Sequence, residues 1–251
     1  MPVIDSVVRA LVQARRNGLA AAAAQTLPDA AAAYAVQDGV ALEFDWFGEA
    51  MPRHWKSGGP SRSAVLTHAP LPPAGVWTSP ADGHDWPFHL RGIEAEVALR
   101  LGCDVGPNEA AGLELATASA LVDAMCVSIE IVDTRWSDGL DAAPLAKLAD
   151  LQAHGALVLS HWLPFEARDW AAQICRVTIG RQRAVERRGT HALADPLFVL
   201  PAWLRHATRK GRSVPAGTVV TTGTWCGILQ ANAGDRVHAN FPGIGSASVQ
   251  L

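Results

Sequence analysis

The chain has 251 residues, a formal net charge of −3 and 49% hydrophobic residues, and these values exclude several classes of protein. Its length is sufficient for a sizeable buried core, and its composition argues against a disordered chain. The 21 basic residues are spread along the sequence without a basic patch, so no nucleic-acid partner is expected. No apolar run approaches the length of a membrane span, so no membrane partner is expected either.

The cysteines and the first residues bear on the compartment in which the protein works. The cysteines lie far apart without a C-x-x-C pair, at Cys103, Cys126, Cys175 and Cys226. This spacing favours reduced, mostly buried thiols over disulfides or a zinc site. Residues 1–16 lack the uninterrupted apolar segment of a signal peptide. A soluble, cytoplasmic protein with the size of an enzyme is expected.

Two helices are predicted near the start of the chain. The first covers residues 4–14 and is closed by Asn17-Gly18. The second covers 30–43, with Asp29 as its N-cap. Their alanine-rich sequences favour helix and close packing.

These helices form a predicted N-terminal helical part at 1–50, followed by a catalytic mixed-sheet domain at 51–251. At the start of this domain, prolines and glycines between Pro52 and Pro87 predict a long irregular stretch. Long loops inside a compact domain often serve as lids or binding loops, so this stretch is a candidate wall of a binding site.

Residues 91–102 alternate between apolar and polar side chains, which predicts a half-buried β-strand. Glu94 and Glu96 are two residues apart and therefore point to the same face. Two like charges so placed repel each other and prefer either bulk water or a shared cation. Taken alone, an E-x-E pair is most simply a solvated strand face.

Further helices and strands follow from the same kinds of pattern. Helices are predicted at 108–125 (capped by Asn108), 145–152 and 195–210, and strands at 127–132, 156–160, 175–179, 218–222, 235–241 and 246–251. Because helices and strands do not alternate regularly, the expected class is α+β with a mixed or antiparallel sheet.

Glu130 is the third carboxylate of interest, because it lies within the apolar strand predicted at 127–132. Burying an ionised carboxylate without a partner is costly. Arg135 could pair with Glu130 or with Asp133, which is the structural alternative. If Glu130 instead meets the two glutamates of the E-x-E strand, the three carboxylates form a hard-oxygen site suited to Mg²⁺ or Mn²⁺.

Two lysines are candidates for proton transfer. Lys56 follows Trp55 and precedes two glycines, and Lys147 lies in the helix predicted at 145–152. A lone lysine is ordinarily a solvated charge. Beside a divalent ion, a lysine is drawn toward its neutral form and can act as a base or orient water. The chain has no phosphate-binding loop, no G-x-S-x-G elbow and no H-E-x-x-H motif.

The motifs together resemble the fumarylacetoacetate hydrolase superfamily. The resemblance rests first on GIEAEVAL at 92–99 and SIEIVDTR at 128–135, and it is strongest to the branch of 2-keto-4-pentenoate hydratases and related 2-oxo-acid decarboxylases. It extends over nearly the whole chain, through Trp55-Lys56, Asp195-Pro196-Leu197 and the segments 219–225, 233–239 and 242–246.

The resemblance implies a rolled mixed β-sheet with flanking helices, homo-oligomeric assembly and a small 2-oxo acid as substrate. It implies Mg²⁺ or Mn²⁺ as the cofactor, with Glu94, Glu96 and Glu130 as the metal ligands. It further implies catalytic roles for Lys56, Lys147 and Asp150, and substrate binding by Thr222 and Gly223.

Three departures from the hydratase pattern leave the reaction open. Leu151 replaces the asparagine that follows the aspartate retained at Asp150, and Lys147 is typical of the hydrolase branch. The acidic residue expected in the long loop has no counterpart at matching spacing, since Asp82 and Asp85 fit it poorly.

The expected function is a metal-dependent hydratase of a 2-hydroxy-dienoate or 2-oxo-enoate in aromatic catabolism. The alternatives are an acylpyruvate-type C–C hydrolase, a 4-oxalocrotonate-type decarboxylase, and a protein without catalytic activity that binds a 2-oxo acid or stabilises a partner subunit.

Overall fold

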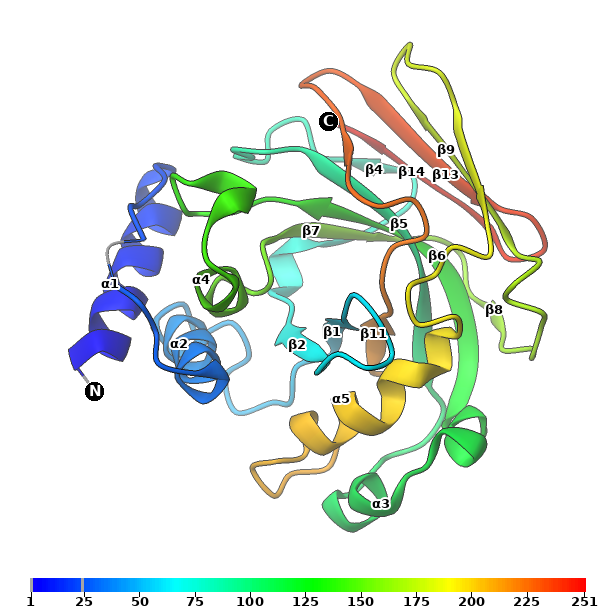
Figure 1. Ribbon diagram of the computed structural model, residues 1–251, viewed down its shortest axis with the longest axis horizontal. Helices are drawn as coiled ribbons and strands as arrows, with labels where there is room; N and C mark the ends of the chain where they lie inside the picture. The colour runs from blue at the N-terminus through cyan, green and yellow to red at the C-terminus, as the bar shows by residue number, and fades with distance from the viewer. Residues whose placement is uncertain (1, 24) are drawn as a thin grey trace.

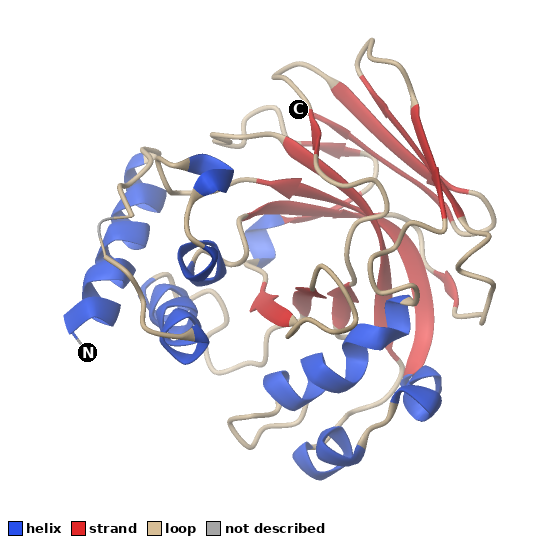
Figure 2. Cartoon of the chain, in the orientation of Figure 1, coloured by secondary structure: helices blue, strands red, loops and turns tan. Residues whose placement is uncertain are grey.

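The computed structural model describes residues 2–23 and 25–251 and shows a curled mixed sheet with helices beside it (Figures 1 and 2). The helices are α1 (Pro2–Asn17), α2 (Ala30–Glu43), α3 (Pro107–Gly112), α4 (Pro144–Ala149) and α5 (Leu200–Ala207). The strands are β1 (His54–Gly58), β2 (Thr67–Pro70), β3 (Val76–Thr78), β4 (Ala81–Asp82), β5 (Gly92–Leu101), β6 (Val122–Val132), β7 (His154–Leu159), β8 (Leu163–Pro164), β9 (Ile174–Ile179), β10 (Val185–Arg188), β11 (Val219–Thr221), β12 (Leu229–Gln230), β13 (Arg236–Phe241) and β14 (Gly245–Gln250).

The described strands form two sheets. The larger has the order β2-β1-β11-β5-β6-β7-β3, with β12 and β8 paired to β5 and β6. In it, β1 with β11 and β3 with β7 are parallel, and β5 with β6 is antiparallel. The smaller has the order β10-β9-β13-β14-β4. This arrangement confirms the predicted α+β class with a rolled mixed sheet.

The pair β5–β6 is the centre of the larger sheet and positions the site. The apolar residues of β5 face the interior: Ile93, Ala95 and Val97 are fully buried. The antiparallel register places Glu94 directly opposite Glu130. Side chains opposite each other in such a pair lie on the same face of the sheet, so the register by itself brings carboxylates from two distant segments together.

The described residues form three clusters of buried hydrophobic side chains, of which the smallest includes Leu71, Ala98 and Leu157. The main core fills the space between the sheets and α5. The second is formed by α1 and α2 packed against residues 136–149, and Trp136 is one of its buried members. A partly buried ion pair, in which Arg15 Nη2 lies 2.9 Å from Asp150 Oδ1, also connects α1 to the residue that follows α4. The boundary between an N-terminal part at 1–50 and a catalytic domain at 51–251 stays a prediction.

The stretch between Pro52 and Pro87 is more regular than predicted. It contains β1, β2, β3 and β4, each of five residues or fewer. Strands this short carry too few alternations for a reliable sequence pattern, and they are stabilised by pairing with distant strands. The segment between β1 and β2 is irregular, as expected, and Gly59, Pro60 and Val65 of this segment line a cavity.

The prediction of one helix at 108–125 is wrong, both in its first and last residues and in Asn108 as its N-cap. The α-helix α3 begins after Gly106, a 3-10 helix covers Leu115–Leu121, and the remaining residues belong to β6. Extended backbone at Leu113 and Glu114 interrupts the helix. Pairing of β6 with β5 outweighs the helical propensity of the local sequence.

Two other predicted helices are shorter than expected. The one predicted at 145–152 ends at Ala149, because Leu151, Gln152 and Ala153 all adopt positive φ. The one predicted at 195–210 begins as a 3-10 helix at Pro196–Val199 and continues as α5 only to Ala207. Among the residues that the structure describes, no helix combines the length and the apolar character that crossing a bilayer requires.

Candidate functional site

The three glutamates singled out in the sequence lie together at the centre of the larger sheet. Glu94 and Glu96 come from β5, and Glu130 comes from β6. One carboxylate oxygen from each lies within 4.8 Å of the others. Glu130 and Glu96 are buried, and Glu94 is partly exposed to the cavity in front of them. The spacing is short enough for all three to bind one cation.

Glu96 is oriented by the last residue of β11 and by the turn that follows it. Thr221 Oγ1 and the backbone N–H of Gly223 (N···O 3.0 Å) both donate to Glu96 Oε2. Ser128 of β6 in turn lies 2.8 Å from the Thr221 hydroxyl. Hydrogen bonds to one carboxylate oxygen fix the plane of the carboxylate and leave the other oxygen free to bind a ligand.

In Glu130, as in Glu96, one carboxylate oxygen accepts hydrogen bonds from described residues of the protein and the other does not. Lys56 Nζ and His154 Nδ1 both contact Oε1, the latter at 3.0 Å. A carboxylate oxygen can only accept, so Nδ1 carries the proton in this pair. Among the described residues no group donates a hydrogen bond to Oε2, although this oxygen is buried. An ionised, buried oxygen without a partner is unfavourable, and a bound cation would satisfy it.

Burial and the neighbouring charges affect the three glutamates differently: they favour the protonated forms of Glu94 and Glu96 and the ionised form of Glu130. Burial, together with the charges of Glu96 and Glu130, raises the pKa of Glu94 to about 8. Burial and Glu130 raise the pKa of Glu96 to about 7. Burial would raise the pKa of Glu130 as well, but Lys56 and His154 outweigh it and lower that pKa.

The same charges act on Lys56. Burial favours its neutral form, yet the charges of Glu130, Glu94 and Glu96 outweigh burial and raise the pKa of Lys56. Its ammonium also donates to Gln152 O at 3.2 Å. The Gln152 carbonyl is turned toward Lys56 in a run of three non-glycine residues at positive φ. Such backbone is held in place only by its surroundings and is concentrated at functional sites.

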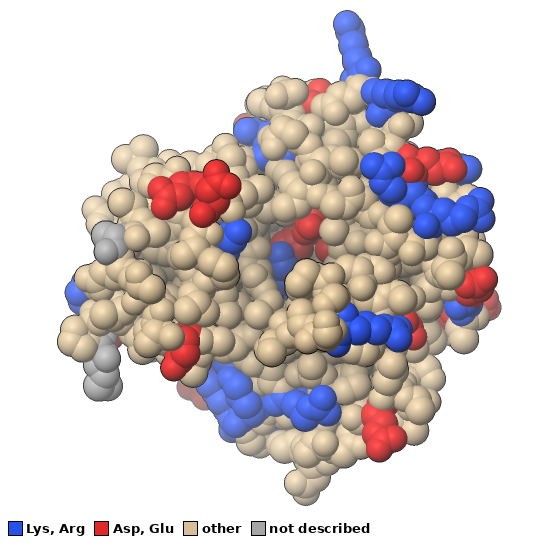
Figure 3. All heavy atoms as spheres, viewed as in Figure 1, with Lys and Arg blue, Asp and Glu red and all other residues tan. Residues whose placement is uncertain are grey.

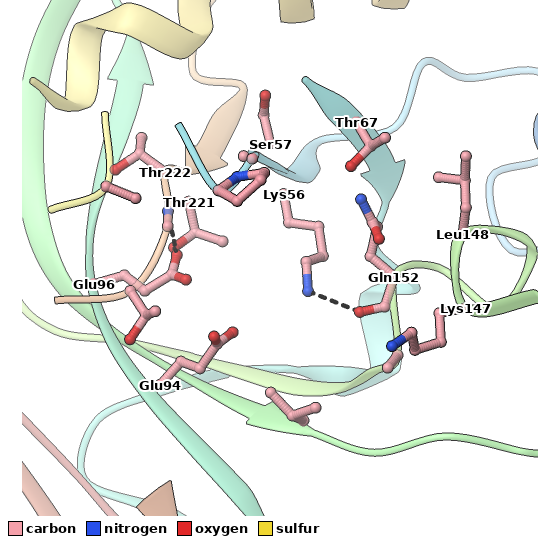
Figure 4. A pocket seen from close by; sticks show the side chains of 18 of the residues that line it. Lys56, Ser57, Thr67, Glu94, Glu96, Lys147, Leu148, Gln152, Thr221 and Thr222 are labelled. Carbon is pink, nitrogen blue, oxygen red and sulfur yellow. Dashed lines mark hydrogen bonds between the residues drawn. The ribbon is translucent and has the colours of Figure 1, made fainter. Parts of the chain in front are cut away.

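Glu94, Glu96 and Lys56 line a cavity of about 940 Å³, and Glu130, which pairs with Lys56, is fully buried beside it. In the space-filling view, acidic and basic side chains meet at the bottom of a hollow near the centre of the face shown (Figure 3). In the close-up, Glu94 and Glu96 lie on one side, Lys147 lies on the other, and Lys56 extends between them (Figure 4). Glu94 and Glu96 are therefore at the opposite end of this row from Lys147.

Of the remaining residues predicted for the site, Thr222 and Gly223 are at the cavity and Asp150 is not. Thr222 and Gly223 line the cavity, and the Thr222 hydroxyl donates to Val97 O at 2.7 Å. Asp150 is fully buried behind it, where its carboxylate accepts from Arg135 Nε at 2.8 Å and also contacts Arg15. Their roles in catalysis or binding stay predictions.

Arg135 does not pair with Glu130, which was the structural alternative for that carboxylate. Its guanidinium contacts Asp150 and, at 3.6 Å, Asp133. The partners of Glu130 are Lys56, 74 residues away, and His154. His154 is the residue of the site that sequence reasoning missed. The available signal was its position close to the acidic motifs, two residues before the strand predicted at 156–160.

Comparison with known proteins gives a direct match for most of the chain. Residues 48–251 match the family model for the fumarylacetoacetate (FAA) hydrolase C-terminal domain. The chain is 32% identical over 157 residues to a 2-keto-4-pentenoate hydratase of Burkholderia vietnamiensis, with 61% of this chain and 58% of the relative covered. It is 33% identical to one from Paraburkholderia phymatum over 159 residues, with the same shares covered. The chain thus aligns with 58% of the length of these curated relatives.

Solved structures share the fold. The 4-oxalocrotonate decarboxylase from Pseudomonas putida G7, complexed with magnesium and adipate, superposes with a TM-score of 0.80 at 19% identity, covering 98% of this chain and 97% of that one. Fumarylpyruvate hydrolase from Pseudomonas aeruginosa, in complex with Mn²⁺ and pyruvate, gives 0.57 at 13% identity, covering 80% and 89%. With the family model matched over residues 48–251, these findings confirm the predicted superfamily: the chain belongs to the fumarylacetoacetate hydrolase family.

Proposed function

We propose that this protein is a divalent-metal-dependent hydratase of a 2-hydroxy-dienoate or 2-oxo-enoate. The observation that carries the proposal is the convergence of Glu94, Glu96 and Glu130 at one end of a cavity that Glu94, Glu96 and Lys56 line. The curated relatives named 2-keto-4-pentenoate hydratase support the choice of reaction.

The residues present fit a divalent cation. All three ligands are carboxylates, which hard cations prefer, and Glu130 Oε2 is a buried oxygen without a protein partner among the described residues. A bound ion would act as a Lewis acid toward the oxo and carboxylate oxygens of a 2-oxo acid. We propose Mg²⁺ or Mn²⁺, supported by the magnesium and Mn²⁺ in the structures of the two related enzymes.

Lys56 is the proposed proton carrier. A lysine ammonium has three N–H donors, and Glu130 Oε1 and Gln152 O occupy two of them. The third is available to a ligand in the cavity that Lys56 lines. From this position the Nζ ammonium would deliver a proton to a carbon of the bound substrate, and Glu130 would stabilise its charged form before the transfer.

Two other reactions on the same site are supported by specific observations. The match over 98% of the chain to a 4-oxalocrotonate decarboxylase supports decarboxylation of a 2-oxo acid. The match to a fumarylpyruvate hydrolase, together with Lys147 in the cavity, supports C–C cleavage of an acylpyruvate. All three reactions need the same carboxylates and Lys56, and they differ in the bond that changes.

The proposal is tested by incubating the purified protein and Mg²⁺ with 2-hydroxypentadienoate, 4-oxalocrotonate and an acylpyruvate, each followed by absorbance and by product identification. We expect hydration of the dienoate, reduced by about a hundredfold or more in Lys56→Met, because positioned acid–base groups contribute that much. Glu94→Gln should lose Mg²⁺ binding, and Glu109→Gln, an exposed glutamate of α3, is the matched control.

Each result bears on a different part of the proposal. Turnover of 4-oxalocrotonate or the acylpyruvate alone would replace the hydratase by the corresponding alternative. No turnover of any substrate would favour a protein that only binds a 2-oxo acid. Full Mg²⁺ binding by Glu94→Gln would contradict the metal site.

We also propose that the protein is a cytoplasmic homo-oligomer and that it functions in aromatic catabolism, as the family resemblance implies. Light scattering of the purified protein tests the assembly.

A further inference from the structure

The turn that follows α4 holds one side of the Lys56 site. Gln152 O accepts from Lys56 Nζ at 3.2 Å (Figure 4). Leu151, Gln152 and Ala153 all adopt positive φ, between 53° and 60°. Left-handed backbone at three successive non-glycine residues is unfavourable and persists only where surrounding contacts hold it. The position of this carbonyl therefore depends on contacts outside the turn.

Asp150 receives the first of these contacts. It is the residue at which α4 ends, and its side chain is fully buried. Arg135 Nε and Arg15 Nη2 both donate to Asp150 Oδ1, at 2.8 and 2.9 Å. Arg135 follows β6, whereas Arg15 is in the last turn of α1. Because a buried carboxylate is costly unless it is paired, α1 contributes directly to holding the residue from which the turn begins.

Gln37 of α2 supplies the second contact. Its side chain is buried, and its amide donates to Leu148 O at 2.7 Å and to His68 O at 3.3 Å. Leu148 lies in the last turn of α4. His68 pairs with Ser57 in the β1–β2 ladder, next to Lys56. One amide thus joins the helix that precedes the turn to the strand pair that carries Lys56.

Both N-terminal helices lie outside the family match. α1 and α2 precede residues 48–251, and they share a hydrophobic cluster with α4 (Figure 1). Apolar packing is non-directional, whereas a hydrogen bond requires a defined distance and angle. Arg15 and Gln37 therefore add to this cluster the directional contacts that set α4 and its turn relative to β1.

We propose that Arg15 and Gln37 are positioning residues for the reaction, which hold the turn after α4 and strand β1 at the separation at which Gln152 O orients Lys56. The inference rests on the proposed function, in which Lys56 carries the proton. The N-terminal helices would then serve catalysis without touching the substrate, because they act on Lys56 through the turn and through β2.

The position of Lys56 can be measured without an activity assay. The chain has three lysines, so protein labelled with [ε-¹³C]lysine gives one ¹³C NMR resonance for each, and Lys56→Met and Lys210→Met assign two of them. We expect the Lys56 resonance to shift in Arg15→Met and in Gln37→Leu. The resonance of Lys210, which pairs with Asp38 at the surface, should keep its position.

Steady-state kinetics on the substrate that wild type turns over gives the second measurement. Arg15→Met should lower kcat per Mn²⁺-binding site by about tenfold, because displacing a reacting group by about 1 Å costs up to about a hundredfold. KM should stay near its wild-type value. Arg15→Lys keeps a cation beside Asp150 and should recover most of kcat. Arg16→Met and Gln13→Leu, at exposed residues of α1, are the matched controls and should behave as wild type.

The two measurements separate positioning from a structural role and from the proposed function. A purely structural role would lower Tm and the number of Mn²⁺-binding sites but leave the Lys56 resonance and kcat per site unchanged, and this result would overturn the inference. No turnover by wild type would contradict the proposed function, whereas a Lys56 resonance that shifts in Arg15→Met would still support the positioning. If Gln37→Leu does not fold, Arg15→Met and Arg15→Lys decide the inference by themselves.

Discussion

Glu130 illustrates how single residues prepare the site. Its oxygen Oε1 accepts from both Lys56 and His154, and its oxygen Oε2 is buried with no partner among the described residues. His154 is itself fully buried, so its ring cannot turn away without disturbing the core. The consequence is a carboxylate whose plane is set by protein donors and whose second oxygen has no hydrogen-bond partner among the described residues. Groups that orient metal ligands in this way typically change metal affinity when they are removed.

The first prediction concerns His154. In His154→Phe, Glu130 keeps the Lys56 contact but loses the donor at Nδ1, so we expect the Mn²⁺ dissociation constant to rise by about tenfold or more. Electron paramagnetic resonance of free Mn²⁺ measures this directly, without an activity assay. His154→Asn restores an N–H near the same position and should recover most of the affinity. An unchanged dissociation constant in His154→Phe, with the variant folded, would show that His154 does not orient the carboxylate.

At the scale of elements, the junction between β6 and β7 determines where Glu130 and His154 meet. The register of this pair shifts between Ile131 and Val132. Gly155 lies opposite the shift, where an added Cβ would be 2.7 Å from Ile131 O and 2.8 Å from Asp133 Cβ. Only a residue without a side chain allows the two backbones to approach this closely. The glycine therefore permits the strand geometry on which the site depends.

The second prediction follows from this contact. Gly155→Ala should destabilise the protein by about 1–3 kcal/mol, because the neighbouring atoms belong to backbone and to Cβ and must move. Gly112→Ala is the matched control, since an added Cβ there meets no atom within 4 Å. Urea unfolding followed by circular dichroism gives both values. Equal midpoints for the two variants would mean that β7 accommodates the methyl group without strain.

At the scale of the whole molecule, the stability of the fold is linked to protons and to the cation. The pKa of Glu94 is raised from 4.5 to about 8, and that of Glu96 from 4.5 to about 7. At a pH between the ordinary pKa of 4.5 and the raised pKa of each group, the folded chain binds more protons at these two glutamates than the unfolded chain does. The contribution of both groups to the free energy of unfolding therefore falls as pH rises through this window. A divalent cation would offset that loss, because it binds the ionised carboxylates.

The third prediction is a pH-dependent stabilisation by metal. The increase in Tm caused by a fixed excess of Mg²⁺ should be small near about pH 6 and larger near about pH 8.5, since binding must displace fewer protons at the higher pH. Differential scanning calorimetry with Mg²⁺ and with a chelator measures the increase. Glu109→Gln should behave as wild type, and Glu94→Gln should show little increase at either pH. A Tm increase that does not change with pH would contradict the linkage.

The sequence by itself determined the elements whose patterns are local. Alternation predicted β5, the Asp29 cap predicted the start of α2, and an acidic residue in an apolar strand identified Glu130 as unusual. These features depend on neighbouring residues, so periodicity reveals them. The same local reasoning failed between 108 and 125, where pairing with a distant strand outweighs helix propensity.

Only the tertiary structure decided how these parts combine into a site. The register of β5 on β6 places Glu94 opposite Glu130, and the packing of β1 and β7 brings Lys56 and His154 to one oxygen of that carboxylate. Contacts between residues so far apart depend on strand order and register, which no local pattern encodes. The sequence thus determined which side chains are suited to bind a cation, and the fold decided which of their oxygens are free to do so.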